Sequence, residues 1–149
     1  MQFSALVSFV SAIFALAIFT AVEAAPASTK VSAACLGFRI TSPVASGLKW
    51  TYGQCYSVDW DLGASQVKTI KSVDLYSSST KKKIATEKSN VAGTAGTSGN
   101  FPLLMGDDLE SGNYYFQVNA VTASGATCTL STVAFNVNVN PNSPPVTHC

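Results

Sequence analysis

The stretch Tyr114-Tyr115-Phe116-Gln117-Val118-Asn119-Ala120-Val121 decides the fold. Tyr114, Phe116, Val118 and Ala120 alternate in it with more polar residues. Because successive side chains of a β-strand point to opposite faces, this period of two predicts a strand with one face in a core. The turn Ser124-Gly125 follows, and we expect the chain to return in an antiparallel strand over 127–139.

Similar short apolar runs recur upstream, bounded by Gly, Ser, Thr, Asn and Pro. The expected strands cover 36–41, 54–60, 72–77, 81–87 and 101–105. We expect Tyr56, Val58 and Trp60 to share one face, and Val73 and Leu75 to point into the core. About seven short strands without a helical period between them predict an all-β fold, an immunoglobulin- or fibronectin-like antiparallel β-sandwich. The stretch Leu109-Glu110-Ser111-Gly112-Asn113-Tyr114 resembles the tyrosine corner of such sandwiches.

The N-terminal segment 1–24 has the pattern of a secretory signal peptide. Residues 5–19 form an apolar run without charge, and the small residues Val22 and Ala24 precede a possible cut before Ala25. An uncleaved membrane anchor is the alternative, but the run is shorter than the about 20 residues that a span needs. We therefore expect a secreted, extracellular protein that has no membrane contact after cleavage.

These patterns divide the chain into four segments. They are the signal peptide 1–24, an N-terminal segment 25–35, a sandwich domain 36–139 and a Pro-rich tail 140–149. Proline removes ladder donors, so the tail cannot continue a strand. No apolar stretch follows the tail, and we expect no glycolipid anchor.

The four cysteines are an even set in an oxidising compartment, which predicts two disulfides. In a seven-stranded sandwich, the start of the first strand and the loop before the last lie at one end, and the start of the second strand and the end of the last lie at the other. This places Cys35 beside Cys128 and Cys55 beside Cys149, and we predict these pairs; the two other pairings stay open. The absence of a C-x-x-C spacing argues against a structural zinc site, and we expect no metal.

Several short motifs resemble the N-terminal domain of the fungal yeast-cell-wall-synthesis KRE/KNH-like family, which is related to Ser-Thr-rich glycosylphosphatidylinositol-anchored membrane proteins. The motifs are Ile40-Thr41-Ser42-Pro43, Trp50-Thr51-Tyr52-Gly53-Gln54, Val58-Asp59-Trp60, Gly99-Asn100-Phe101, Leu109 to Phe116, and Ser131-Thr132-Val133-Ala134-Phe135. The match spans about 38–137. It implies a secreted fungal sandwich protein connected with β-1,6-glucan or wall organisation, and it supplies no catalytic residue. The chain lacks the long Ser/Thr-rich tail and anchor signal of many members, which favours free secretion or non-covalent retention.

Few residues offer catalysis. The single histidine, His148, stands in the tail beside a cysteine, where neither a serine triad nor a copper site is expected. The acids Asp107, Asp108 and Glu110 match a plain turn better than a calcium loop. A net charge of +1 argues against nucleic acid. We interpret the basic run 81–83 as a solvated strand edge, with contact to an acidic wall polymer as the alternative. We therefore expect neither an enzyme nor a cofactor.

Strand alternation also predicts an outward face rich in tyrosines and amides. Its expected members are Asp74, Tyr76, Tyr115, Gln117, Asn119 and Asn136. Aromatic rings stack on sugars while amides and carboxylates bind hydroxyls, so this face is a candidate glycan contact. A purely structural cross-strand pair of Tyr76 and Tyr115 is the alternative. The leading hypothesis is a non-catalytic wall module that contacts β-glucan or a wall protein. The alternatives are a small secreted effector or protein-interaction domain and, third, an enzyme.

Overall fold

The structure is a computed structural model that describes residues 31–107 and 110–149. The predicted signal peptide, residues 25–30 of the segment that follows it, and Asp108 and Leu109 lie outside the described residues. Within the described part the chain forms ten strands and two short 3₁₀ helices, η1 (Ala33–Cys35) and η2 (Gly93–Ala95).

The main sheet has six strands and is built around one long pair. β5 (Val67–Ser77) and β8 (Gly112–Thr122) run antiparallel, paired from Val67–Thr122 to Ser77–Tyr114. β6 (Lys83–Ala92) extends the sheet beyond β5, and β9 (Thr127–Ser131) pairs with β8 on its other side. β10 (Phe135–Asn138) continues along β8 after β9 ends, and β2 (Lys49–Thr51) joins β10 in parallel.

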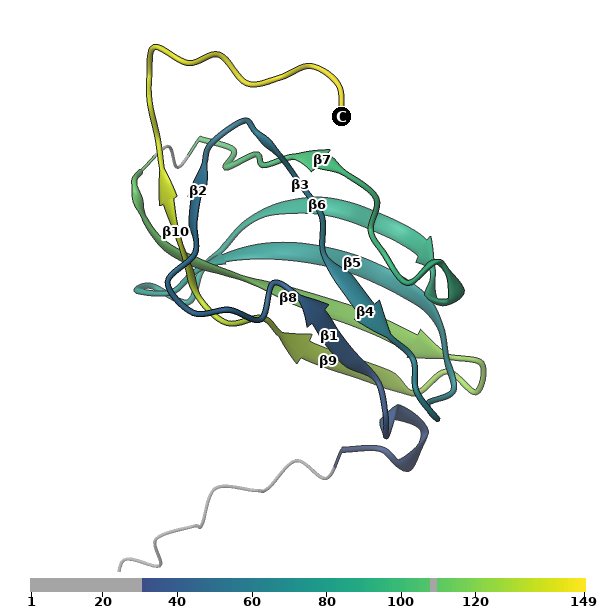
Figure 1. The fold of residues 1–149 in the computed structure, drawn as a ribbon. Coiled ribbons are helices and arrows are strands. Elements are labelled where there is room, and N and C mark those ends of the chain that lie inside the picture. Colours follow the sequence, from purple (N-terminus) through teal and green to yellow (C-terminus); the bar gives the residue numbers. More distant parts are fainter. Residues whose placement is uncertain (1–30, 108–109) are drawn as a thin grey trace, which may run out of the picture.

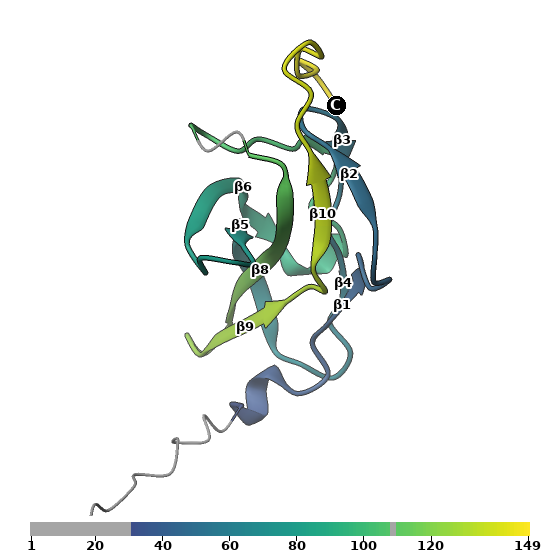
Figure 2. The same cartoon turned by 90° about the vertical axis from the view of Figure 1, so that its left-hand side faces the viewer.

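Four short strands lie across from this sheet. β1 (Arg39–Ser42) pairs with β4 (Asp59–Asp61), and β3 (Cys55–Tyr56) pairs with β7 (Phe101–Pro102). Figures 1 and 2 show the arrangement from two sides: β1, β3 and β4 form a layer opposite β5, β6 and β8. The molecule is therefore an all-β sandwich, as the sequence predicts.

The core fills the space between the layers, because the alternating residues of both point inward. Val73, Leu75, Phe116 and Val118 are fully buried on the main sheet, and Trp60 is buried in the opposite layer. The Trp60 indole N–H donates to the Gly93 carbonyl at 2.7 Å, which satisfies its buried polar atom. The alternation in β5 and β8 therefore identified the core correctly.

Three details of the strand prediction need correction. The segment 54–60 divides into β3 and β4, and 127–139 divides into β9 and β10. The second break is a bulge. Between the pairs Gln117–Ser131 and Tyr114–Phe135, the segment 131–135 contains one residue more than the stretch of β8 opposite it. Lys49–Thr51 was not predicted as a strand, and its pairing with β10 is parallel rather than antiparallel.

Both disulfides have the predicted pairing. Cys35 joins Cys128 with 5.6 Å between Cα atoms, and Cys55 joins Cys149 with 5.8 Å. The second disulfide holds the Pro-rich tail against the sandwich. There the Val146 N–H donates to the carbonyl of Gly53, and a Cβ on this glycine would lie 2.5 Å from a backbone atom of the tail.

The tyrosine corner is also present. The Tyr114 hydroxyl donates to the Glu110 carbonyl at 2.7 Å, four residues upstream. This bond fixes the point at which the chain enters β8, and with it the register of the strand at the centre of the sheet.

Candidate functional site on the outer face of the main sheet

The predicted surface residues of β5 and β8 lie opposite one another on the side of the sheet away from the core. Tyr76 pairs with Tyr115, Asp74 with Gln117, and Ser72 with Asn119. On the next strand Ser131 lies beside Gln117, and Thr129 beside Asn119. The expected juxtaposition of tyrosines and amides is therefore present across two long, hydrogen-bonded strands.

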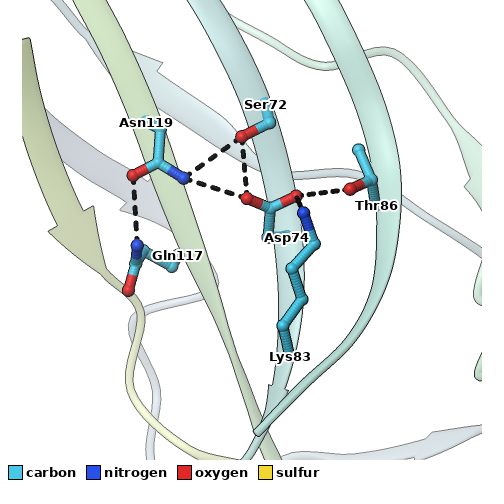
Figure 3. A network of polar contacts seen from close by, with 6 residues as sticks. All are labelled: Ser72, Asp74, Lys83, Thr86, Gln117 and Asn119. Atoms are coloured by element: carbon cyan, nitrogen blue, oxygen red, sulfur yellow. Dashed lines mark hydrogen bonds and ion pairs between the residues drawn. The ribbon is translucent and has the colours of Figure 1, made fainter.

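Asp74 is the centre of a polar network on this face (Figure 3). One carboxylate oxygen accepts from the Ser72 hydroxyl at 2.8 Å and from the Asn119 amide at 3.0 Å. The other accepts from the Thr86 hydroxyl at 2.6 Å and lies 2.8 Å from the Lys83 ammonium. The carboxylate is thus surrounded by donors.

The network extends from Asp74 through Asn119 toward β9. The amide oxygen of Asn119 accepts from the Gln117 amide and the Thr129 hydroxyl, both at 3.1 Å. Most of these polar groups therefore already have partners within the protein, which holds the face rigid.

This geometry corrects the expectation that Asp74 is an exposed ligand for sugar hydroxyls. Asp74 points away from the core but is only 4% exposed, because side chains from both neighbouring strands cover it. Burial alone would raise its pKa, but hydrogen bonds from Lys83, Thr86 and Ser72, together with the Lys83 charge, lower the pKa below its ordinary value of 3.8. Asp74 is an ionised structural residue of this face.

Lys83 differs from its interpretation as a freely solvated edge lysine. Its ion pair with Asp74 follows from the register of β6: irregularities between Val73 and Asp74 and between Leu75 and Tyr76 shift the opposing residues. Sequence alternation alone does not contain these shifts, so the contact could not be predicted.

Tyr76 and Tyr115 stack on one another, with ring centroids 5.6 Å apart and planes inclined by 19°. The Lys81 ammonium lies over the Tyr115 ring, 5.4 Å from its centroid. Both tyrosines are half-buried. The cross-strand pair, which was the alternative interpretation of the sequence, is therefore present, and it supports Tyr115 from one side.

A shallow groove of about 440 Å³ lies beside Tyr115. Its lining comes from the β5–β6 turn, from β8 and from the break between β9 and β10: Ser78, Lys81, Tyr115, Ser131, Thr132 and Ala134. We refer to Tyr76 and the residues of this groove as the Tyr115 face. Apart from Tyr76 and Tyr115, its members were not predicted. Ser131, Thr132 and Ala134 were assigned to one continuous strand over 127–139, and Lys81 was assigned to the strand 81–87.

Asn136 is exposed but lies apart from the polar network. It pairs with Asn113 at the start of β8, and its amide donates to the Asn113 side chain at 3.3 Å. The bulge between β9 and β10 accounts for this position, because Ser131 and Thr129 occupy the places beside Gln117 and Asn119.

Catalytic or metal-binding groupings find little support elsewhere. Across residues 31–107 and 110–149, no cluster of three or more His, Cys, Asp or Glu side chains could hold a metal ion. Glu87 is half-buried, and burial raises its pKa to about 8. The hydrogen bond that its carboxylate accepts from the Leu104 N–H at 3.2 Å acts in the opposite direction and lowers the pKa, but by less. No helix in the part described is long and apolar enough to cross a membrane.

A second, apolar surface runs along the open side of the sandwich where β1 approaches β9. Two neighbouring grooves share Phe38 and Leu130. Four exposed apolar side chains line them: Val31, Leu36, Val44 and Val133. Exposed apolar residues that gather in one place are typical of contact surfaces.

Comparisons with known proteins do not assign this chain to a family. No family model matches the sequence, and no curated protein matches it. Among solved structures, the chain is similar to the fibronectin(III)-like modules of Clostridium thermocellum CbhA, with 17% identity and a TM-score of 0.41. The similarity covers 69% of this chain and 46% of that one. The relation to the KRE/KNH-like family stays a prediction from short motifs.

Proposed function

We propose that the chain is an extracellular, non-catalytic β-sandwich module that contacts β-glucan of the fungal cell wall through the Tyr115 face. The observation that supports this most directly is the position of Tyr115. Its ring lies on the central strand of the sheet, backed by Tyr76 and bordered by a groove whose polar lining residues include Ser131 and Thr132. An aromatic ring with a few placed polar groups is the usual composition of a small-ligand site.

The extracellular setting is supported by the disulfides. All four cysteines are paired, and such bonds form and persist in oxidising compartments. The fungal wall itself is the part of the proposal that depends on the family resemblance.

The polar network has a supporting role in this proposal. Because Asp74 and Asn119 bind one another and their neighbours, they hold β5, β6 and β8 in register beneath the tyrosines. Rigid placement of a ring reduces the entropy lost when a ligand binds. The sugar would therefore contact Tyr115 and the groove, while Asp74 acts only through the sheet.

Retention on insoluble β-glucan tests the proposal. Tyr115→Ala removes the ring, and we expect it to lower the affinity at least about fivefold, for the loss of about 1 kcal/mol of aromatic contact. Tyr115→Phe keeps the ring and should keep binding. Tyr52→Ala is the matched control, since Tyr52 does not line the groove beside Tyr115 and packs against the hydrophobic core.

Absence of retention for the unaltered protein would reject the glucan proposal.

The apolar grooves between β1 and β9 favour a second candidate function, a secreted effector or protein-interaction domain. Exposed Val44 and Val133 are better suited to contact with a protein than with a sugar. Leu36→Ser together with Val44→Ser should abolish binding to such a protein partner, and neither residue lines the groove beside Tyr115. Turnover of glucan oligomers by the pure protein would instead indicate an enzyme.

A further inference from the structure

The lysine beside Tyr115 has an uncommon backbone conformation. Lys81 lies in the β5–β6 turn with a φ of 58°, in the left-handed region that Gly and Asn adopt most easily. Its N–H donates to the Ser77 carbonyl at 3.0 Å, which closes the turn. A long, charged side chain is thus present where the local structure favours a small one, and the turn directs it toward Tyr115.

The Lys81 ammonium has a weak partner. It lies 5.4 Å from the centroid of the Tyr115 ring, and among the described residues it forms no ion pair. Lys83, two residues further on, is instead neutralised by Asp74 at 2.8 Å. The two lysines differ because their side chains contact different strands. The Lys83 ammonium contacts Asp74 on β5, whereas the Lys81 ammonium contacts Tyr115 on β8.

The groove contains one positive charge. Among the described residues that line it, Lys81 is the only charged one. Ser78 adds a buried hydroxyl without a hydrogen-bond partner among the described residues. A buried polar atom without a partner is uncommon.

We propose that the Tyr115 face selects acidic saccharides, whose carboxylate or phosphate pairs with Lys81 while the sugar ring stacks on Tyr115. This inference rests on the proposed glycan-binding function and adds a preference to it: the face binds neutral β-glucan, and it binds a saccharide that carries an anionic group more tightly. A neutral sugar must displace the ammonium from the ring without giving it a new partner. An acidic sugar supplies an anion for the ammonium. The Lys81 ammonium can then leave the Tyr115 ring and pair with this anion, and the sugar ring stacks on the tyrosine that the ammonium has left.

The test compares matched acidic and neutral ligands in solution. Trigalacturonic acid and mannose 6-phosphate are the carboxylate and phosphate probes, and galactotriose and mannose are their neutral controls. We expect the acidic member of at least one pair to bind about tenfold more tightly at low ionic strength, as one charge-assisted contact contributes. The pair that shows the preference identifies the anion, and the preference should shrink as salt is raised.

Lys81→Asn is the decisive variant, because asparagine tolerates the left-handed backbone and carries no charge. We expect it to fold with an unchanged or higher Tm, to lose the preference for the acidic ligand and to keep or improve binding of the neutral one. Lys82→Asn, one residue away in the same turn, is the matched control and should keep the preference.

The outcomes separate the two proposals. Equal affinity for acidic and neutral sugars, or a preference that survives Lys81→Asn, overturns the acidic selectivity and leaves the glycan-binding function standing. No binding of any saccharide, including insoluble β-glucan, overturns both.

Discussion

Replacing Asp74 by asparagine tests whether this carboxylate is structural, as its burial indicates. The carboxylate accepts from four donors, two on each oxygen. An amide of the same size has one acceptor oxygen, so two of the donors lose their partner and the charge of Lys83 is no longer balanced. Charge-assisted hydrogen bonds contribute about 1.5–3 kcal/mol each, and the half-exposed Lys83 contributes less. We expect Asp74→Asn to lower the free energy of unfolding by about 2–3 kcal/mol near neutral pH.

The pH dependence provides an independent check of this loss. The folded pKa of Asp74 lies below its ordinary value of 3.8, so its ionised form stabilises the fold above that value. This contribution disappears as the pH falls through the folded pKa. The difference between Asp74→Asn and the unaltered protein should therefore be large near neutral pH and small in strong acid, as measured by urea denaturation.

Asp61→Asn is the matched control for the same substitution. Asp61 pairs with Arg39 on the surface, where the two side chains are 42% and 67% exposed. Exposed pairs contribute about 0–1 kcal/mol, so little stability should be lost. Equal losses for the two variants, or a loss at Asp74 that does not depend on pH, would refute the structural role of the network.

Three further predictions concern stability, each measured by denaturant unfolding. The folded pKa of Glu87, about 8, exceeds its ordinary value of 4.5, so the unaltered protein loses stability as the pH rises between these values. We expect this loss to be about 2 kcal/mol after a discount for partial exposure. Glu87→Gln should remove the loss, so the variant should be more stable than the unaltered protein above about pH 8. Replacing Cys55 and Cys149 by serine opens a loop with a sequence separation of 94 and should cost up to about 4–5 kcal/mol; a much smaller loss would mean that the tail does not constrain the unfolded chain. Tyr114→Phe removes the hydrogen bond to the Glu110 carbonyl and should cost about 1 kcal/mol, and an unchanged midpoint would contradict the role of the corner.

The sandwich was predictable because its central strands have clear alternation. In β8 every second side chain is buried, from Tyr114 to Ala120, and the sequence period alone reveals this. The disulfide pairing followed from the same topology, since strand order places the cysteines at opposite ends. These features depend on local pattern and on the connectivity of the chain.

What the sequence did not reveal depends on register between strands. The bulge after Ser131 interrupts an alternation that continues in the sequence through Phe135, so two strands were predicted as one. The irregularities between β5 and β6 bring Lys83 and Thr86 onto Asp74, which changes an expected surface ligand into a buried structural acid. A shift of one residue leaves the apolar period almost intact but changes which polar side chains meet.

The central claim, that the Tyr115 face contacts wall saccharide, is tested most directly by titrating the isotope-labelled protein with soluble β-glucan fragments and acidic oligosaccharides while recording amide chemical shifts. We expect saturable changes that centre on Tyr76, Tyr115 and the turn containing Lys81, with Val44 and its neighbours unaffected. Saturable changes confined to the grooves between β1 and β9, or no change at millimolar saccharide, would contradict it.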